Sequence, residues 1–391
     1  MTRTEPDADL LIFLVAGEAS GDALAARMMA SLSEQTGGAV RFAGVGGPRM
    51  AEQGLESLFP MEELSVMGLA EVLPRLPQLI RRLKETERAV RRLQPSALVT
   101  VDSPDFSFRL AKRLRGQGFP LIHYVAPTVW AWRPGRARKI AHFLDHLLAL
   151  FPFEPPYFER EGLSCSFVGH SVVESGAAHG DGDAFRRQRN IAPDTPLVCV
   201  LPGSRHGETS RLLPIFDEAL RKLAAARPDL RVVVPVAPTV EGEVSHAIQD
   251  WPVPAETVTG EATKFDAFAA ADVAIAASGT VSLELALAGL PTVIAYKTSL
   301  ITAWIARRLI RVRFVNLINI VLDREAVPEL LQEDCRADTI AEAVETLLGD
   351  DEAAKAQISA AAAALQRLGA GGSSPSHRAA EAVLNAIRRG N

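Results

Sequence analysis

The segment LLIFLVAGEASGD, Leu10–Asp22, joins seven apolar residues to a turn with two glycines and three polar side chains. An uninterrupted apolar run of this length predicts a strand buried on both faces, as in a parallel sheet. Ligands of open α/β sheets bind at the carboxyl ends of the strands, so the turn is a candidate site. We expect Glu18 to point into it and Ser20 or Asp22 to cap the next helix. An ordinary capped strand–helix turn is the alternative interpretation.

Short apolar runs and amphipathic stretches alternate along the rest of the chain. They form two groups separated at 169–196, which predicts two doubly wound parallel-sheet domains with a cleft between them. The predicted domains are 1–170 and 171–345, followed by C-terminal helices at 346–391 that either return to the N-terminal domain or are exchanged in a dimer. The expected strands are Leu10–Ala16, Val40–Val45, Ala97–Val101, Leu121–Val125, Leu147–Leu150, Ser166–Val168, Leu197–Leu201, Arg231–Val236, Val273–Ala276 and Thr292–Tyr296.

The composition excludes several classes of protein. Apolar residues make up 48% of the 391 residues and charged residues 23%, which is ordinary for a globular chain. Forty-two Lys and Arg against 47 Asp and Glu leave a net charge of −5, which disfavours a nucleic-acid partner. Three cysteines form no disulfide framework, and no apolar run is long enough to span a membrane. We therefore expect a cytosolic protein, or one attached to a membrane from the cytosolic side.

Further candidate residues follow later strands of the first group. Asp102 comes directly after an apolar run and is expected to face the cleft as a catalytic carboxylate, with Asp105 capping the next helix. Trp130 and Trp132, with His123 and Arg133 nearby, predict either a sugar or lipid site or a packed aromatic loop. The glycine-rich Gly44–Met50 departs from a dinucleotide fingerprint, because Arg49 occupies its sixth position. Close backbone approach between the two domains is its expected use.

Two turns of the second group favour a nucleotide. Backbone N–H groups and the guanidinium of Arg205, in Leu201–Arg205, suit a diphosphate. Ser278, Gly279 and Thr280 present further donors, and Glu284 lies one helical turn beyond Thr280, where its carboxylate could accept hydrogen bonds from a ribose diol. The Asp181–Asp183 pair lies in a Gly-rich and Ala-rich stretch, so we interpret it as a solvated linker rather than a metal site.

Two stretches are both basic and apolar, Val66–Leu83 and Leu300–Phe314. In an acidic protein this combination favours a membrane-surface patch, and helices that face the core are the alternative. Pro74 and Pro77 interrupt the first stretch, so we do not expect one smooth helix there.

Nine motifs occur in a particular order: GEASGD, GVGGPRMAEQG, MEELSVMG, DSPDF, HYVAPTVWAW, FPFE, FVGH, LPGSR and SGTVSLE. In this order they resemble the lipid-A-disaccharide synthase family from about Leu10 to about Cys335. The resemblance implies a GT-B glycosyltransferase fold, in which two Rossmann-like domains flank a cleft. It also implies an inverting transfer from UDP-2,3-diacylglucosamine to the 6-hydroxyl of 2,3-diacylglucosamine 1-phosphate, with no metal or other cofactor.

The resemblance also implies roles for particular residues. Asp102 matches the proposed catalytic aspartate, and whether it or Glu18 is the base stays open. Asn319 keeps the family's asparagine, while Ile318 and Asp323 stand where the family pattern has Pro and Gly. The positions that match the family's cleft and nucleotide residues are Glu18, Ser20, Arg205, Ser278, Gly279, Thr280 and Glu284. Partners implied by the family are the anionic inner-membrane surface, on its cytosolic face, and a second copy of the chain.

Other functions remain as alternatives at this level. The nearest are enzymes of the same fold, an undecaprenyl-linked N-acetylglucosamine transferase or a UDP-N-acetylglucosamine 2-epimerase. A dinucleotide oxidoreductase is disfavoured by the failed fingerprint. A non-catalytic nucleotide-binding protein would keep the motifs of the second half without requiring Asp102.

Overall fold

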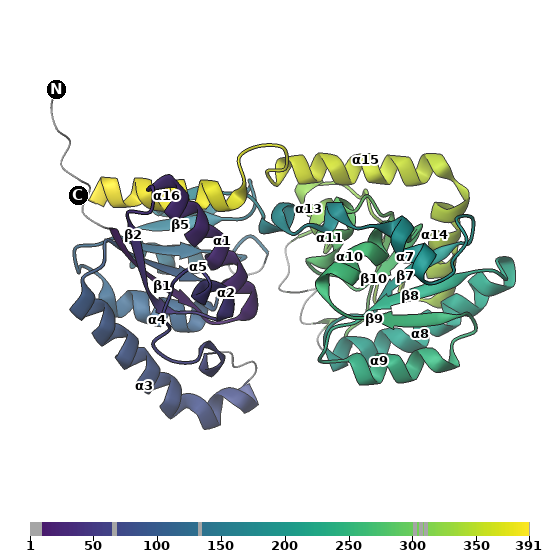
Figure 1. Ribbon diagram of the computed structural model, residues 1–391, viewed down its shortest axis with the longest axis horizontal. Coiled ribbons are helices and arrows are strands. Elements are labelled where there is room, and N and C mark those ends of the chain that lie inside the picture. The colour runs from purple at the N-terminus through teal and green to yellow at the C-terminus, as the bar shows by residue number, and fades with distance from the viewer. Residues whose placement is uncertain are drawn as a thin grey trace. The chain divides into compact units, whose positions relative to one another are not determined.

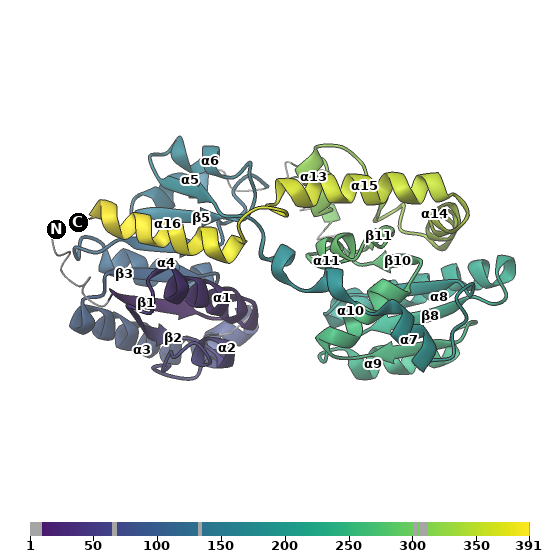
Figure 2. The same ribbon diagram turned by 45° about the horizontal axis from the view of Figure 1, so that its top comes forward.

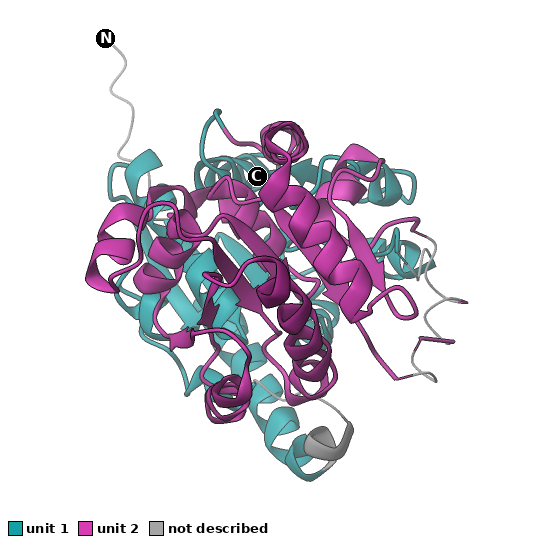
Figure 3. Cartoon of the chain, turned by 90° about the vertical axis from the view of Figure 1, so that its right-hand side faces the viewer, with its two compact units in different colours: residues 1–171, 371–391 teal, residues 172–370 magenta. Residues whose placement is uncertain are grey.

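A computed structural model describes residues 10–64, 69–131, 135–299, 303–304, 308 and 312–390, except the side chains of 69–73 and 390. The chain forms two compact units, shown in separate colours in Figure 3. Unit 1 comprises Met1–Ser171 and Gly371–Asn391, and unit 2 comprises Val172–Ala370. Each unit is described by itself.

Unit 1 is a parallel six-stranded sheet in the order β2-β1-β3-β4-β5-β6 (Figure 1). Its strands are β1 (Leu10–Ala16), β2 (Val40–Val45), β3 (Ala97–Val101), β4 (Leu121–Tyr124), β5 (His146–Ala149) and β6 (Ser164–Phe167). Its helices are α1 (Ala19–Gln35), α2 (Pro48–Ala51), α3 (Leu69–Leu93), α4 (Pro104–Leu114), α5 (Gly135–Ala141), α6 (Pro155–Glu159) and α16 (Pro375–Gly390), with a 3₁₀ turn at Met61–Glu63.

The sheet of unit 1 is covered on both faces, as its continuous apolar strands predict. Alternate residues of β1 enter different cores: Phe13 joins the core beneath α3 and α4, and Leu14 the core beneath α1 and α16. Both side chains are fully buried. Apolar burial on both faces is the main term that stabilises such a sheet.

Asp22 is buried within the first turns of α1 but does not cap that helix. The residue before α1 is Glu18, whose side chain makes no capping hydrogen bond. The Asp22 carboxylate instead accepts backbone N–H groups from Gly47, Arg49 and Met50, at 2.9, 3.0 and 3.0 Å. Its partners begin α2, so the expected local cap is wrong and the contact is a tertiary one that sequence spacing does not reveal.

The glycine-rich turn after β2 serves contacts inside unit 1. Gly44 has φ +144° and lies opposite Leu14, so a side chain there would collide with the backbone of β1. A Cβ on Gly47 would lie 2.7 Å from an oxygen of Asp22. The close approach that these glycines permit is therefore to β1 and α1.

The structure also corrects the expectation for the first basic stretch. Pro74 and Pro77 both lie inside the single helix α3. Each proline removes one helical hydrogen bond, but both are exposed, so water can bind the carbonyl groups left without a donor.

Unit 2 is a second parallel six-stranded sheet, in the order β12-β11-β10-β7-β8-β9. Its strands are β7 (Leu197–Leu201), β8 (Arg231–Pro235), β9 (Ala255–Val258), β10 (Val273–Ala276), β11 (Thr292–Tyr296) and β12 (Glu329–Leu331). The sequence did not reveal the two edge strands β9 and β12, which are short and contain Glu256 and Glu329. The residues of β9 and β12 do not favour a strand by themselves, and pairing with β8 and β11 stabilises the strand conformation.

The helices of unit 2 cover both faces of its sheet (Figure 2). They are α7 (Gly182–Gln188), α8 (His206–Ala226), α9 (Glu241–Ala247), α10 (Glu261–Ala270), α11 (Val281–Leu287), α13 (Leu317–Leu322), α14 (Ala337–Gly349) and α15 (Asp351–Arg367), with 3₁₀ turns at Ser171–Glu174, Ala177–His179 and Ile248–Asp250.

The segment that precedes α7 packs against α10 and is not a linker, although Asp181 and Asp183 themselves are exposed, as the sequence predicted. Asp181 caps α7 by accepting the N–H of Ala184 at 2.8 Å, and its own N–H donates to Asp266 at 2.7 Å. Side chains at Gly180 or Gly182 would collide with the backbone of α10. Asp181 therefore serves as a helix cap, and Asp183 lies exposed in the first turn of α7.

The C-terminal helices belong to different units. Gln357 of α15 donates to and accepts from the backbone of Thr292, the first residue of β11. Helix α16 lies against α1 of the same chain (Figure 1), where Val383 is fully buried and Gln35 donates to the carbonyl of His377 at 2.9 Å. The exchange of this helix in a dimer stays a prediction. No helix in the described part of the chain is long and apolar enough to cross a bilayer.

Asp22 provides a test of this account of unit 1. Asp22→Ala leaves three N–H groups without their acceptor, and we expect it to lower the free energy of unfolding by about 2–3 kcal/mol. Asp105→Ala is the matched control, because Asp105 is exposed in the first turn of α4 and should change stability by less than about 0.5 kcal/mol. Denaturant unfolding measures both, and equal effects of the two substitutions would contradict this role of Asp22.

Candidate functional site

Asp102 directly follows β3 and has a left-handed backbone conformation that most residues avoid. Asp102 has φ +52° and Ser103 φ +44°, and α4 begins at the next residue, Pro104. The turn is held by two hydrogen bonds, from the Ser103 N–H to the Asp102 carboxylate at 2.9 Å and from the Ser107 hydroxyl to the Asp102 carbonyl at 2.9 Å. Consecutive left-handed non-glycine residues cost energy and are concentrated at functional sites.

Glycines bring the first turn of the chain against this strained turn. Ala16 of β1 pairs with Val101 of β3, so their carboxyl ends are adjacent. A Cβ on Gly17 would lie 2.5 Å from the hydroxyl oxygen of Ser103, and one on Gly21 would lie 3.8 Å from the Cβ of Asp102. The two glycines thus permit close packing of protein on protein.

The structure therefore places three predicted residues of unit 1 at one edge of its sheet. Glu18 precedes α1 and is partly exposed, Ser20 is exposed in its first turn, and Asp102 is partly exposed at the neighbouring strand end. Asp105 lies inside α4 rather than before it, so its expected capping role is wrong.

Strain extends to the next strand of this edge. Val125 directly follows β4 and has φ +82°, which is unfavourable for a β-branched residue. It is held there by the hydrogen bond from its N–H to the carbonyl of Leu148, at 3.1 Å. The N–H of Asp102 donates to the carbonyl of Tyr124, the residue before Val125, at 3.0 Å, so the two strained turns are directly linked.

His123 does not face this edge. Its side chain is fully buried on β4, with Nδ1 2.8 Å from the hydroxyl of Thr100 and its ring edge-on to Phe108. Burial, and to a smaller extent the charge of Arg136, lowers the pKa of His123 to about 3. The imidazole is neutral at physiological pH and belongs to the core, so it is not a candidate to line a sugar site.

The aromatic loop is packed where the structure describes it. The indole N–H of Trp130 donates to Glu154 at 3.0 Å, and its ring packs edge-on to Phe151 and Phe153. Burial raises the pKa of Glu154 to about 7, against the opposing effect of three N–H donors. The sequence interpretation of a packed loop holds for Trp130, whereas Trp132 lies outside the described residues.

In unit 2 the two predicted nucleotide turns are neighbours. Leu201 of β7 pairs with Ala276 of β10, and the Ala277 N–H donates to the Leu201 carbonyl at 2.8 Å. The turn after β7 requires Gly203, which has φ +111°. Arg205 precedes α8 and is 67% exposed, with its guanidinium 3.3 Å from Glu208. Exposed pairs of this kind are weak, so the guanidinium can turn towards another anion.

The turn after β10 carries Ser278, Gly279 and Thr280, of which the last two are exposed. Thr280 is the residue before α11, and a Cβ on Gly279 would meet open space. Glu284 follows in the first turn of α11, where both of its carboxylate oxygens bind the ammonium group of Lys264, at 3.1 and 2.9 Å. The sequence carried no signal for Lys264, because it lies 20 positions earlier on another helix.

Asn319 is at a different place in unit 2 and is fully buried. Its amide donates to the Val327 carbonyl and the Glu329 carboxylate, at 2.8 and 2.7 Å, and accepts from the N–H groups of Ala326 and Val327, at 2.8 and 2.9 Å. All four positions of the amide are therefore used by the protein. Asp323 ends α13 at φ +53°, a conformation that Asp tolerates in place of glycine.

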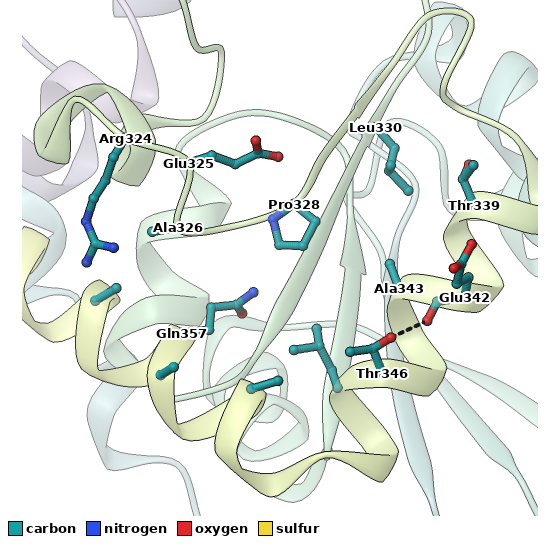
Figure 4. A pocket seen from close by; sticks show the side chains of 14 residues that line it. Arg324, Glu325, Ala326, Pro328, Leu330, Thr339, Glu342, Ala343, Thr346 and Gln357 are labelled. Carbon is teal, nitrogen blue, oxygen red and sulfur yellow. Dashed lines mark hydrogen bonds between the residues drawn. The ribbon is translucent and has the colours of Figure 1, made fainter.

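A hollow of about 570 Å³ in unit 2 lies away from these turns. Figure 4 shows Arg324 and Gln357 on one side of it and Thr339 and Glu342 on the other. Gln357 binds the first residue of β11, so the hollow lies where the strands begin rather than where they end. Within the described residues there is also no cluster of three His, Cys, Asp or Glu that could hold a metal ion.

Solved structures of other proteins share this fold. A UDP-GlcNAc 2-epimerase from Neisseria meningitidis bound to UDP-GlcNAc has a TM-score of 0.60 at 11% identity, covering 97% of this chain and 99% of that chain. The MurG structure from Acinetobacter baumannii has a TM-score of 0.57 at 16% identity, with coverages of 97% and 99%. Two parallel α/β sheets with polar turns at their carboxyl ends define a GT-B glycosyltransferase fold.

Sequence comparison identifies the family. The family model described as lipid-A-disaccharide synthetase matches residues 12–383. A lipid-A-disaccharide synthase from Rhodospirillum centenum is 60% identical over 382 residues, covering 97% of this chain and 95% of the relative. One from Paramagnetospirillum magneticum is 53% identical, with coverages of 97% and 98%. The chain belongs to the lipid-A-disaccharide synthase family and is a glycosyltransferase of lipid A biosynthesis. The alternative enzymes of this fold are thereby set aside.

The left-handed turn at Ser103 can be tested with two small residues. Alanine is strained in this conformation and glycine is not, so Ser103→Gly should be more stable than Ser103→Ala by about 1 kcal/mol. At Ser210, exposed inside α8, the order should reverse by a similar amount, because glycine weakens a helix. Thermal unfolding of the four variants gives both differences, and the same order at both positions would rule out the left-handed turn.

Proposed function

We propose that the chain transfers 2,3-diacylglucosamine from UDP-2,3-diacylglucosamine to the 6-hydroxyl of 2,3-diacylglucosamine 1-phosphate with inversion. In this reaction the acceptor oxygen forms a bond to the anomeric carbon as its proton passes to a carboxylate. The bond between that carbon and the diphosphate breaks, and UDP leaves with the electron pair. Membership of the family is the observation that carries the proposal.

Asp102 is the proposed base. Support comes from its position directly after β3 and from two consecutive left-handed residues, Asp102 and Ser103, since strain of this kind is concentrated at functional sites. Glu18 precedes α1 at the neighbouring strand end and is the rival base, with Ser20 close by in the same helix. A carboxylate that accepts the hydroxyl proton during bond formation typically accelerates such a step by about 10²–10⁴.

We assign the nucleotide to unit 2. Arg205 and the donors of Ser278, Gly279 and Thr280 bind the diphosphate, and Glu284 accepts the ribose hydroxyls. The adjacency of β7 and β10 supports this division, because it places the two turns side by side. Asn319 acts indirectly in this proposal, since its hydrogen bonds hold Ala326 and Val327 in place.

Asp102→Asn tests the base, because asparagine keeps the shape of the side chain but cannot accept the proton. Turnover should fall by about 10²–10⁴, while UDP affinity, measured by calorimetry, should stay within about twofold of wild type. Glu18→Gln is the matched comparison and should lower turnover less. An active Asp102→Asn beside an inactive Glu18→Gln would move the assignment to Glu18.

We further propose that unit 1 binds the anionic cytosolic face of the inner membrane, where acylated substrates reside. Unit 1 has 23 Lys and Arg against 20 Asp and Glu, a net charge of +3, whereas unit 2, with 19 against 27, has −8. The excess of basic residues is concentrated at 88–139, a stretch that contains eleven basic residues and two acidic ones. Anionic lipids attract such clusters.

The described surface of unit 1 supports this proposal. A hollow of about 360 Å³ is lined by Lys112, Arg115, Lys139, His142 and Phe143, without any carboxylate. On α3, Leu76 and Ile80 are 41% and 43% exposed, as an interfacial helix requires. The side chains of Leu69, Val72 and Leu73, and most of the second basic stretch at 300–314, lie outside the described residues.

Neutralising the three permanent charges of this hollow tests the membrane proposal. The triple variant Lys112→Gln, Arg115→Gln, Lys139→Gln should bind vesicles containing phosphatidylglycerol roughly 100-fold more weakly, because each charge contributes about 1 kcal/mol. Neutralising Arg221, Lys222 and Lys355 of unit 2 is the control and should have little effect. Sedimentation with vesicles measures both, and unchanged binding by the first variant would refute the role of this surface.

A further inference from the structure

Lys264 lies beside the proposed ribose site. It belongs to the first turns of α10, and its ammonium nitrogen is 3.1 and 2.9 Å from the two oxygens of Glu284. The Lys264 and Glu284 side chains are only 25% and 22% exposed. Partial burial of this kind makes an ion pair stronger and more rigid than one on the open surface.

Two aromatic rings hold the ammonium group from another side. The nitrogen lies 4.7 Å from the ring centre of Phe265 and 5.9 Å from that of Phe268, both distances at which a cation is attracted to a ring. These rings are themselves in contact, with centres 6.2 Å apart. The backbone of Phe265 is in turn packed against Gly180, where no side chain fits. The ammonium group is thus fixed relative to α10 and to the segment before α7.

The pair leaves Glu284 able to bind a ligand. Two carboxylate oxygens offer about four acceptor positions, and one ammonium group touching both oxygens uses at most two of them. The remaining positions are available for the two hydroxyls of a ribose. Because Glu284 is tied to Lys264, its carboxylate does not have to lose side-chain freedom when the ligand arrives.

The charge of Lys264 addresses a second problem of this site. A nucleoside diphosphate is an anion, and a carboxylate one helical turn beyond Ser278, Gly279 and Thr280 would repel it. Arg205, the cation at the adjacent turn, already lies 3.3 Å from Glu208. Lys264 is a cation in direct contact with Glu284, and its charge neutralises the carboxylate that would repel the diphosphate.

We propose that Lys264 is a positioning residue of the nucleotide site, which orients the Glu284 carboxylate towards the ribose and neutralises it against the diphosphate. The inference rests on the proposed assignment of the nucleotide to unit 2. Lys264 acts through Glu284 and stays away from the reacting atoms, so it should influence the binding of the donor far more than the chemical step.

The test compares UDP binding by calorimetry among Lys264→Met, Lys264→Arg and wild type. Lys264→Met keeps most of the aliphatic stem but loses the charge, and we expect its UDP affinity to fall by at least 10-fold at 0.05 M salt and by a smaller factor at 0.5 M, where charges are screened. Lys264→Arg should stay within about threefold of wild type. Lys222→Met is the matched control, since Lys222 pairs with Asp338 at 2.8 Å elsewhere in unit 2 and should leave UDP affinity unchanged.

Steady-state kinetics separate positioning from a loss of structure. With Lys264→Met, KM for the UDP-sugar donor should rise about 10-fold while kcat at saturating donor stays within about twofold. The double variant Lys264→Met, Glu284→Gln should bind UDP about as weakly as the worse single variant, because the two side chains act as one unit.

Each result decides between the proposals. Wild-type UDP affinity in Lys264→Met overturns the inference while leaving the proposed function intact. Lost affinity that Lys264→Arg does not restore, together with a lowered melting temperature, also overturns it, because the residue is then merely structural. Absence of UDP binding by the wild-type chain overturns the assignment of the nucleotide to unit 2, and the inference with it.

Discussion

The buried carboxylate of Asp22 is the contact on which the architecture of unit 1 depends. By accepting three N–H groups at the start of α2, it joins the beginning of α1 to the turn that follows β2. A buried carboxylate is costly unless its oxygens are hydrogen-bonded, and a helix start is costly when its N–H groups are not. The Asp22 carboxylate and the N–H groups at the start of α2 satisfy each other's hydrogen bonds, so neither is left buried without a partner. The consequence is a fixed position for α1, and with it for Gly21 beside Asp102.

The position of α1 in turn determines the packing at the edge of the sheet that carries Asp102. Gly17 and Gly21 carry no side chains, so the start of α1 can lie directly against the turn at Asp102 and Ser103. The left-handed backbone of this turn and of Val125 is strained, and such strain persists only where surrounding contacts over-determine it. Here those contacts are the hydrogen bonds of the parallel sheet and the close packing of α1. The stability of the sheet thus maintains the orientation of the proposed base.

Unit 2 also holds its polar side chains in fixed positions, but it does so through an ion pair and side-chain hydrogen bonds. Its key turns follow β7 and β10, which are neighbours in the sheet although more than seventy residues separate them in sequence. Glu284 is held by an ion pair with Lys264, and Asn319 by a saturated set of hydrogen bonds. Polar residues that are satisfied by the protein itself keep one conformation, and a ligand then does not have to impose it.

The sequence alone determined the fold class, ten of the twelve strands in the described part of the chain, and the turns that carry polar residues. The reason is that buried parallel strands are long apolar runs and glycine marks the turns between them. Its motif order was specific enough to indicate the family, which the comparisons confirm. It did not reveal the edge strands β9 and β12, whose residues become strands only by pairing with a neighbour. It also assigned Asp22 to the wrong helix and treated Asp181 as part of a solvated linker. Only the tertiary structure decided which groups meet: Asp22 with α2, Lys264 with Glu284, and His123 with the core instead of the site. The physical reason is that periodicity and turn chemistry act over a few residues, whereas these partners are 20 or more positions apart or are set by which face of a strand is buried.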